Sequence, residues 1–207
     1  MIEAQYYQLS GLIDSLTPEE RVQAASWRWS PGSKSAYITL INDYRTARAG
    51  EGKNWNSVLS DTGFSSGRHY FEVEISKFIN SGGGWGISFG LIDVCTDFEY
   101  NHFGHRDNLP KGTRKTWSYV AATGKIYERG VEMMVGRPFS VNDRVGLLLD
   151  FKNLVLQFFL NGVPQGDQPL AFVFAADDQP LFPSLSLNGK KERAGKKERK
   201  NRTEQGK

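Results

Sequence analysis

Apolar and polar residues alternate with a period of two along most of the chain after Ser26, which is the pattern of β-strands with one buried face. The segment 69–75 is the clearest example, because every second residue from Phe71 onward is apolar. Two later segments, 145–151 and 154–160, are almost continuously apolar, which predicts strands buried on both faces in the middle of a sandwich. Further strands are expected at 36–41, 85–91, 117–121, 125–127 and 181–187.

Turn-forming sequences separate these segments. Gly82-Gly83-Gly84, Thr123-Gly124 and Asn161-Gly162 stand at the ends of predicted strands. About nine short strands with almost no helix predict an antiparallel all-β fold of two packed sheets. One helix signal precedes them, because the capping threonine, first-turn proline and glutamates of 17–20 predict a short N-terminal helix over about 18–25.

Charge is distributed unevenly over the 207 residues. Residues 190–207 contain nine Lys and Arg against three Glu, a net charge of +6, and no large apolar side chain. Such a segment cannot offset the entropy cost of ordering, which predicts a disordered basic tail. The first 189 residues carry a net charge of −3, since the whole chain carries +3. We therefore expect an N-terminal extension over 1–25, a sandwich over 26–189 and a tail over 190–207.

The basic tail allows two roles besides keeping the chain in solution. Its cations can contact nucleic acid weakly and without sequence preference, and the runs 190–193 and 196–200 match the pattern of a nuclear-import signal. No apolar stretch approaches the length of a membrane-spanning helix, and no signal peptide is visible at the start. The single cysteine, Cys95, cannot form an internal disulfide. These features predict a cytoplasmic or nuclear protein.

Two carboxylates are the main candidates for catalysis. Glu72 and Glu74 lie two residues apart on a predicted strand, so their Cα atoms share one face about 7 Å apart. Glycosidases use acid pairs at comparable spacing, which makes a carbohydrate-binding or glycoside-hydrolysing sandwich the alternative function. Alternating glutamates are also typical of a solvated strand face. Because no zinc-ligand spacing, phosphate-binding loop or nucleophile elbow is present, we expect no enzyme, catalytic residue, cofactor or metal.

The long segment 93–115 between two predicted strands has the composition of a recognition loop. It combines aromatic and hydrogen-bonding side chains, among them Tyr100, His102 and Arg106. A long loop on a rigid scaffold is more often functional than structural. The alternative is an ordered lid with Tyr100 and Phe103 turned inward.

Several sequence blocks resemble SPRY domains, and they follow the family's order over about 26–187. They include Trp85-Gly86-Ile87-Ser88-Phe89-Gly90, and the others lie at 27–31, 55–59, 63–75, 117–119, 124–127, 143–150, 158–164 and 181–187. The resemblance implies a bent, concanavalin-like jelly-roll sandwich of two antiparallel sheets. It also implies a non-enzymatic module that binds a peptide segment of another protein through loops at one end. Family members serve as adaptors, for example in ubiquitin ligases and chromatin methyltransferase complexes.

The resemblance also suggests individual binding residues. In peptide-binding members with a suppressor-of-cytokine-signalling box, a tyrosine in the loop after the second core strand lines the pocket, and Tyr100 falls there. A basic residue of the early loop corresponds to Arg48. The position of a family tryptophan after the penultimate strand corresponds to Asn188, so that aromatic wall is missing here.

A peptide-recognition module is therefore the leading hypothesis. Trp55 and Tyr100 are expected to be flat aromatic anchors that lose little side-chain entropy on binding. Arg48, His102 and Arg106 are expected to orient a polar or acidic stretch by charge-assisted hydrogen bonds. Asn188 completes the predicted site.

The chain departs from the family at its end. SPRY domains normally close the sandwich with one more alternating strand after the position of Leu187, whereas here a lysine-rich segment follows. Two alternatives remain open at this point: the N-terminal segment supplies the missing pairing, or a sheet edge stays open and is partly guarded by lysines.

Overall fold

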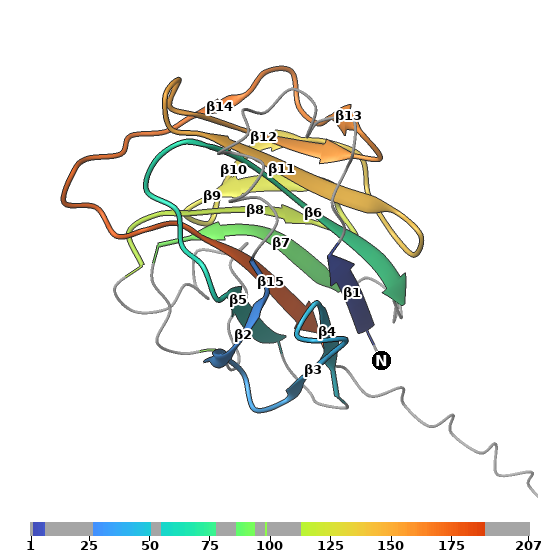
Figure 1. Cartoon of the computed structure of the whole chain (residues 1–207). Helices are drawn as coiled ribbons and strands as arrows, with labels where there is room; N and C mark the ends of the chain where they lie inside the picture. The colour runs from blue at the N-terminus through green and yellow to red at the C-terminus, as the bar shows by residue number, and fades with distance from the viewer. Residues whose placement is uncertain are drawn as a thin grey trace, which may run out of the picture.

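The computed structural model describes residues 2–6, 27–50, 55–77, 86–93, 98 and 113–188, the first of these segments as backbone only. These residues form two antiparallel β-sheets that lie against each other (Figure 1). The β-sandwich predicted from the sequence is therefore confirmed. Within the described part of the chain, no helix is long and apolar enough to cross a membrane.

Sheet A follows the order β13-β12-β11-β6-β1-β4-β3, with β14 also pairing with β12, and sheet B follows the order β10-β9-β8-β7-β15-β5-β2. The strands of sheet A are β1 (Ile2–Tyr6), β3 (Ile38–Ile41), β4 (Thr46–Ala49), β6 (Arg68–Lys77), β11 (Arg144–Asp150), β12 (Val155–Leu160), β13 (Val163–Pro164) and β14 (Leu170–Ala171). Those of sheet B are β2 (Trp29–Lys34), β5 (Trp55–Ser60), β7 (Ile87–Ile92), β8 (Thr116–Val120), β9 (Lys125–Glu128), β10 (Val131–Val135) and β15 (Phe182–Asn188).

Strand boundaries differ from the sequence expectations at a few places. The strand expected over 36–41 begins at Ile38, because the Ser35 hydroxyl accepts a hydrogen bond from the Tyr37 N–H (3.1 Å) and holds a turn there. The strand expected at 125–127 is β9, and it is followed by β10, which was not expected and forms the edge of sheet B. The helix expected over about 18–25 and the turn at 82–84 lie outside the described residues.

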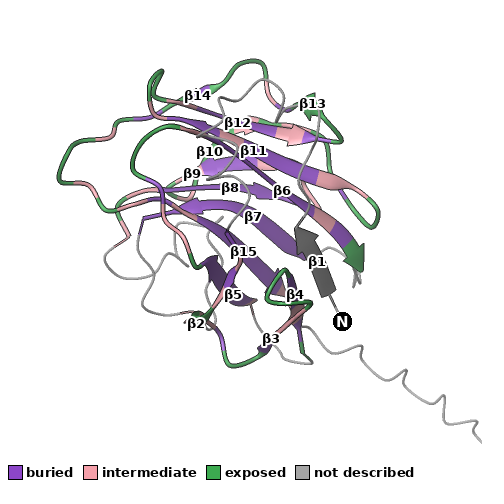
Figure 2. Ribbon diagram, in the orientation of Figure 1, coloured by how far each residue is buried: buried purple, intermediate pink, exposed green. Residues whose placement is uncertain are grey.

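The core consists of the apolar positions that alternate along both sheets (Figure 2). Its largest side chains form edge-to-face ring contacts, such as Trp27 with Trp29 at a centroid distance of 5.1 Å and Trp27 with Phe71 at 5.8 Å. Such contacts stabilise aromatic pairs beyond the burial of their area. The aromatic residues at the start of the sandwich therefore fix the first strand of sheet B against the centre of sheet A.

The expectation that β11 and β12 are buried on both faces is only partly correct. Their inward side chains, such as Leu147 and Phe158, are fully buried. On the outer face, Leu148 and Phe159 are only half-buried. The apolar runs arise because this outer face also carries large apolar side chains. The Phe159 ring, for example, packs against Tyr70 on β6 at a centroid distance of 5.8 Å.

Strand β1 lies inside sheet A, between β4 and β6 (Figure 1). Ala4, for example, is opposite Ala47 on one side and Ile75 on the other, and both of these neighbours are fully buried. Of the two alternatives that the sequence leaves open, the first is confirmed: the N-terminal segment supplies the pairing. Residues 2–6, which the sequence analysis places in an extension, thus join the two halves of sheet A.

We expect Ala4→Pro to destabilise the whole domain. Proline removes a backbone donor from a strand with hydrogen-bonded neighbours on both sides, and the carbonyl that loses its partner lies in a buried part of the sheet. The expected loss is at least about 2 kcal/mol in the free energy of unfolding, measured by urea titration. Ala4→Ser is the matched control, because it changes the side chain but keeps the N–H. Equal stabilities of the two variants would contradict the central position of β1.

Candidate functional site

Two residues predicted to bind a partner lie opposite each other at one end of sheet B. Trp55 is the first residue of β5, Asn188 is the last residue of β15, and the two are cross-strand partners. The Asn188 N–H donates to the Gly86 carbonyl just before β7 (2.9 Å), which ties a third strand to the same end. The structure thus brings Trp55 and Asn188 together, although they are 133 positions apart in the sequence.

The side chains of this pair belong to the outer face of sheet B. Two residues further along the same strands, the hydroxyls of Ser57 and Ser186 form a hydrogen bond of 2.8 Å. Val58 and Leu187, which are sequence neighbours of the two serines, point into the core. Because side chains alternate along a strand, Trp55 and Asn188 share the face of the two serines. Both residues are half-buried at this position.

The long segment 93–115 is closed at its base and attached to this outer face at Phe98. Its ends are joined, because the buried Asp93 carboxylate accepts hydrogen bonds from the Arg114 and Lys115 N–H groups at 3.1–3.2 Å. Further along, the Phe98 carbonyl accepts a hydrogen bond from the Ser57 N–H (2.9 Å). Phe98 also packs on a small apolar cluster with Leu59, Ile92 and Phe182. The segment therefore contacts β5 two residues from Trp55.

Arg48 lies on the other sheet. Its neighbours Ala47 and Ala49 are fully buried in the core, so the Arg48 side chain faces outward from sheet A. Trp55 and Asn188 face outward from sheet B, so the structure does not bring Arg48 onto their face. The remaining predicted residues, Tyr100, His102 and Arg106, lie outside the described residues.

A row of small hydroxyl residues on the same outer face was missed by sequence reasoning. Ser57, Ser186 and Ser88 are aligned across three neighbouring strands, with Ser118 on the next strand. All four are buried, although they lie on the face away from the core. The signal in the sequence is the alternation of small residues with apolar ones in β7 and β15. Small residues at outward positions are also common on solvated strands, so this signal alone does not identify a buried row.

The two carboxylates considered for catalysis form an ion-pair network on the outer face of sheet A. Arg144 Nε lies 3.3 Å from Glu74 Oε2, and its Nη1 lies 3.8 Å from Glu72 Oε1. The Tyr70 hydroxyl donates to Glu72 Oε2 (3.0 Å). Glycine at position 146 makes room for this tyrosine, because a Cβ there would lie 2.1 Å from the hydroxyl oxygen. The guanidinium between the two carboxylates favours a structural role for this pair over acid–base catalysis.

Burial sets the protonation behaviour of Glu72. The side chain is fully buried, and burial raises the pKa of its carboxyl, while the Tyr70 hydrogen bond and the Arg144 charge oppose that rise. Burial likewise raises the pKa of the Tyr70 hydroxyl, so this group stays protonated and remains a donor. Across the described ranges, no three metal-binding side chains come together.

Comparison with known proteins identifies the family. The SPRY domain model matches residues 68–198, which is more than half of the chain. The chain belongs to the SPRY domain family. SPRY domains are generally protein–protein interaction modules, and the resemblance noted in the sequence is therefore confirmed.

Curated relatives that match the SPRY domain chain are much longer proteins. ATP-dependent RNA helicase DDX1 of Xenopus laevis is 24% identical over 163 residues, covering 78% of this chain and 19% of the helicase. Tripartite motif-containing protein 5 of Symphalangus syndactylus is 29% identical over 143 residues, covering 62% of this chain and 26% of that protein. The chain thus spans about a fifth to a quarter of the length of these relatives.

Solved SPRY domains share the fold. The SPRY domain of human HERC1 aligns with a TM-score of 0.56 and 20% identity, covering 77% of this chain and 89% of that domain. The TRIM65 PSpry domain aligns with a TM-score of 0.52 and 17% identity, covering 78% and 90%. At these identities the similarity extends to the sandwich architecture alone.

We expect the stability of the Glu72→Gln variant to increase relative to that of the natural protein as the pH rises. A carboxyl whose pKa is higher in the folded than in the unfolded state binds more protons when folded, so its charge destabilises the fold above that pKa. Neutral glutamine removes this cost. The difference in free energy of unfolding between variant and natural protein should therefore shift in favour of the variant between pH 4 and pH 8, as measured by urea titration.

Glu74→Gln is the matched control for this pH series. It removes the neighbouring carboxylate on the same strand and face, which is partly exposed and also contacts Arg144. The same pH-dependent shift in both variants would mean that the burial of Glu72 is not the cause.

Proposed function

We propose that this SPRY domain binds a peptide segment of a partner protein at the end of sheet B where Trp55 and Asn188 meet. The observation that carries the proposal is the cross-strand pairing of these two residues on the outer face, beside the anchored Phe98. A rigid sheet end with an aromatic side chain provides contact area at a low entropy cost, which is the usual property of binding hot spots.

The attachment of Phe98 supports the inclusion of Tyr100 in this site. Tyr100 follows Phe98 by two residues, and two residues of extended chain span at most about 7 Å. Since the Phe98 carbonyl is bonded to Ser57, two residues from Trp55, covalent geometry limits how far Tyr100 can be from the Trp55 end of β5. His102 and Arg106 follow in the same segment and would supply the charge-assisted hydrogen bonds to a polar or acidic peptide.

The proposal assigns Arg48 a separate role from the pocket. Its side chain is on the outer face of sheet A, opposite Glu3 and Thr39 in the neighbouring strands. Such a position suits a charged contact at the periphery of a large partner, which would influence the rate of association more than the affinity. The domain would act as an adaptor between its partner and another protein.

The test is quantitative affinity capture with mass spectrometry from extract of the cells that contain the protein. We expect a reproducible set of captured proteins with the natural chain and loss of at least nine-tenths of that set with the double variant Trp55→Ala/Tyr100→Ala. The reason is that aromatic hot spots contribute about 2 kcal/mol or more each, and one kilocalorie changes binding about fivefold.

Tyr44→Ala is the matched control for the capture experiment. Tyr44 is an exposed aromatic residue in the turn between β3 and β4. Its carbonyl accepts a hydrogen bond from the Trp29 N–H, and Trp29 is opposite Ser60, at the other end of β5 from Trp55. Its removal should leave the captured set unchanged, and thermal unfolding should show that all variants are folded. Capture that survives the double variant, or that falls equally with Tyr44→Ala, would contradict the proposed site.

The basic tail is proposed as a signal for nuclear import, which would make the protein cytoplasmic and nuclear. Replacing residues 190–207 by a glycine–serine linker of equal length should lower the nuclear fraction of a fluorescent fusion, because receptors of basic import signals read clustered lysine and arginine. An unchanged distribution would leave the tail with a solubilising role or a weak contact to nucleic acid, which salt-dependent binding to an RNA homopolymer would reveal.

A further inference from the structure

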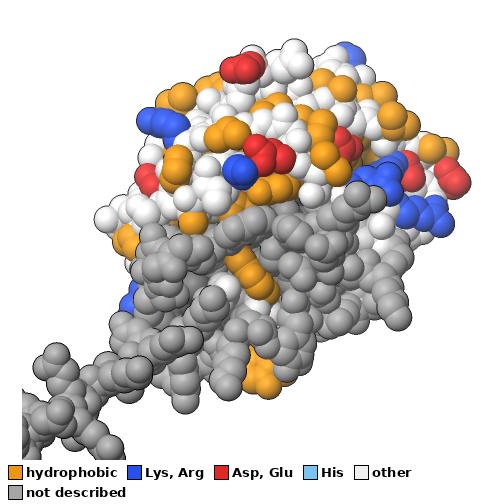
Figure 3. Space-filling view, turned by 180° about the vertical axis from the view of Figure 1, so that it is seen from behind, with side chains coloured by type: hydrophobic (Ala, Val, Ile, Leu, Met, Phe, Trp, Pro, Cys, Tyr) orange, Lys and Arg blue, Asp and Glu red, His pale blue; other side chains and the backbone are white. Residues whose placement is uncertain are grey.

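Strand β10 forms the outer edge of sheet B and exposes an apolar surface. It pairs with β9 on one side, and no other described strand pairs with it. Val131, Met133 and Val135 are 53%, 46% and 57% exposed. Three of the large hydrophobic side chains exposed in the described part of the molecule thus lie on one strand of five residues. Figure 3 shows hydrophobic side chains gathering on the upper part of the rear face, among single charged groups.

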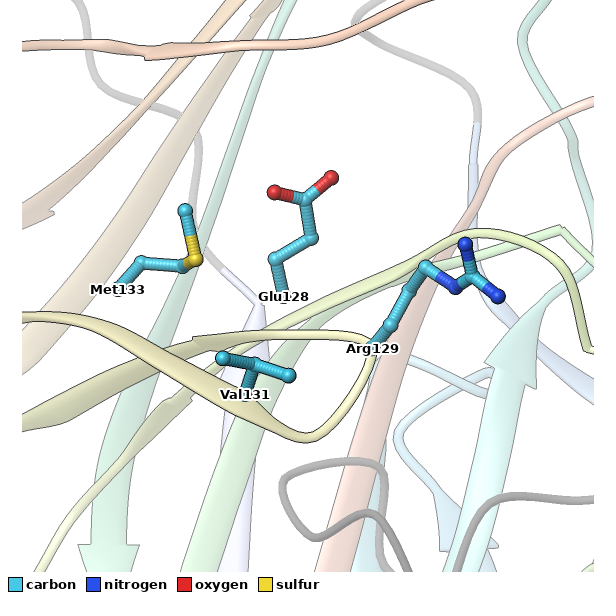
Figure 4. Close-up of a pocket in the computed structure, with 4 residues that line it drawn as sticks. All are labelled: Glu128, Arg129, Val131 and Met133. Carbon is cyan, nitrogen blue, oxygen red and sulfur yellow. The ribbon is translucent and has the colours of Figure 1, made fainter.

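A groove runs along this edge. Glu128, Arg129, Val131 and Met133 line a hollow of about 400 Å³ at the β9–β10 hairpin (Figure 4). A second hollow of about 280 Å³ shares Glu128 and Arg129. It continues to Ala171 at the end of β14 in sheet A and to the two residues that follow it. Its lining includes the buried Trp117 and Phe172, whose ring centroids are 5.7 Å apart. We call the two hollows together the edge groove.

Strand β10 has backbone N–H and C=O groups that point away from β9, toward its unpaired side. The Gly136 N–H donates to the Gly124 carbonyl (2.7 Å), so these two residues are a hydrogen-bonded pair. The adjacent pair, Val135 and Lys125, is therefore a pair without backbone hydrogen bonds between its two residues. In an antiparallel pair, the N–H and C=O of such a residue point away from the partner strand. At the other end, Arg129 and Gly130 form a tight turn with φ of 48° and 73°. The same alternation therefore directs the backbone of Glu132 outward.

The charge of the edge groove indicates what it can accept. Arg129 and Arg114 are both exposed at the groove. Neither forms an ion pair in the described part of the chain, but the Asp178 carboxylate interacts electrostatically with Arg114. Lys115 is paired with Asp178. The lining thus contains one carboxylate, that of Glu128, and two guanidinium groups, those of Arg114 and Arg129. An occupant with a carboxylate at the turn end of the groove would therefore be complementary in charge.

The same charges disfavour a second copy of the chain. If β10 paired antiparallel with β10 of another copy about Met133, Arg129 of each copy would lie opposite Arg137 of the other. Both arginines are exposed, and like charges in directly opposite positions destabilise a strand pair. Two further features disfavour the pairing of β10 with an arbitrary strand. They are the bulge between Glu132 and Met134 and the Lys125–Glu132 ion pair (2.7 Å) on the outer face.

We propose that an extended, partly acidic peptide segment of a partner protein adds as a strand to β10. Main-chain hydrogen bonds to Glu132 and Val135 would hold it, as in other cases of strand addition. Its alternate apolar side chains would cover Val131 and Met133, and its carboxylate would meet Arg129 and Arg114. This surface is separate from the end of sheet B discussed above, because four strand spacings of about 4.8 Å separate β10 from β15.

The test begins with a displayed library of random twelve-residue peptides. It is selected on the complete 207-residue chain and counter-selected on Met133→Glu. We expect the selected peptides to show apolar residues at every second position and an acidic residue at one end. Synthetic copies should bind Val131→Glu and Met133→Glu at least tenfold more weakly than the natural chain, since a charge would replace the apolar contact. Arg129→Asp, which tolerates the positive φ of this turn position, should weaken binding and reduce its salt dependence.

The control Val163→Glu places the same charge at a 50% exposed valine on β13, at the edge of sheet A, and should leave binding unchanged. Trp55→Ala should also leave it unchanged, so failure here and failure of the proposed pocket are distinguishable. Methylation of peptide backbone nitrogens should abolish binding at alternate positions only. Hydrogen exchange at the amides of Glu132 and Val135 should slow when peptide is bound.

Three results would overturn the proposal. The first is a selection that yields no peptide sensitive to Met133→Glu. The second is binding that survives backbone methylation at every position, which would indicate side-chain docking without an added strand. The third is a dimer of the free chain, seen by sedimentation and disrupted by Met133→Glu, which would make a second copy the occupant.

Discussion

The continuity of sheet A depends on a strand of five residues at the start of the chain. Without β1, β4 and β6 would each present an unpaired edge in the middle of the sandwich. Unpaired buried backbone groups are costly, and open edges invite pairing with other chains. The last described strand, β15, also lies in the interior of its sheet, between β5 and β7. The first and the last described strands are thus placed in central positions, and among the described strands the sheet edges fall on others.

This arrangement gives the two proposed binding surfaces different properties. Trp55 and Asn188 lie on two strands that are paired on both sides, so their backbone is fixed and the surface is built from side chains and the attached segment around Phe98. Strand β10 has the opposite property, because one of its sides is unpaired and its backbone can contribute directly. The two surfaces therefore correspond to two kinds of recognition, one through side chains at a strand end and one through the main chain at a sheet edge.

The sequence predicted the central strands because their alternation is strong. In β6 and β11, inward apolar residues such as Phe71 and Leu147 repeat at every second position, and a register shift by one residue would expose them all. β1 and β10 were not predicted as strands. The five residues of β1 give little pattern, and its position depends on partners more than 40 residues away. In β10, three apolar residues face solvent, so a prediction that relies on buried apolar positions does not identify this strand.

The candidate site was predictable in part for a related reason. Family resemblance suggested Asn188, and aromatic composition suggested Trp55, but their direct pairing follows from the placement of β15 beside β5. Arg48 shows the limit of such reasoning. It is close in sequence to Trp55, but it lies on β4 of sheet A, and the alternation of that strand turns its side chain outward, away from sheet B. Sequence proximity does not reveal which layer of a sandwich a residue belongs to.

The two proposed surfaces share one physical element. Lys115 lines the edge groove, pairs with Asp178 and lies 5.0 Å from the centre of the Phe174 ring. Its backbone N–H is also bonded to Asp93, at the base of the segment that includes Phe98. A peptide in the groove would cover a residue whose main chain holds the ends of that segment together. Any energetic coupling between the two surfaces would therefore have its shortest route through the Asp93–Lys115 contact, since the other strands between them are held by paired neighbours on both sides.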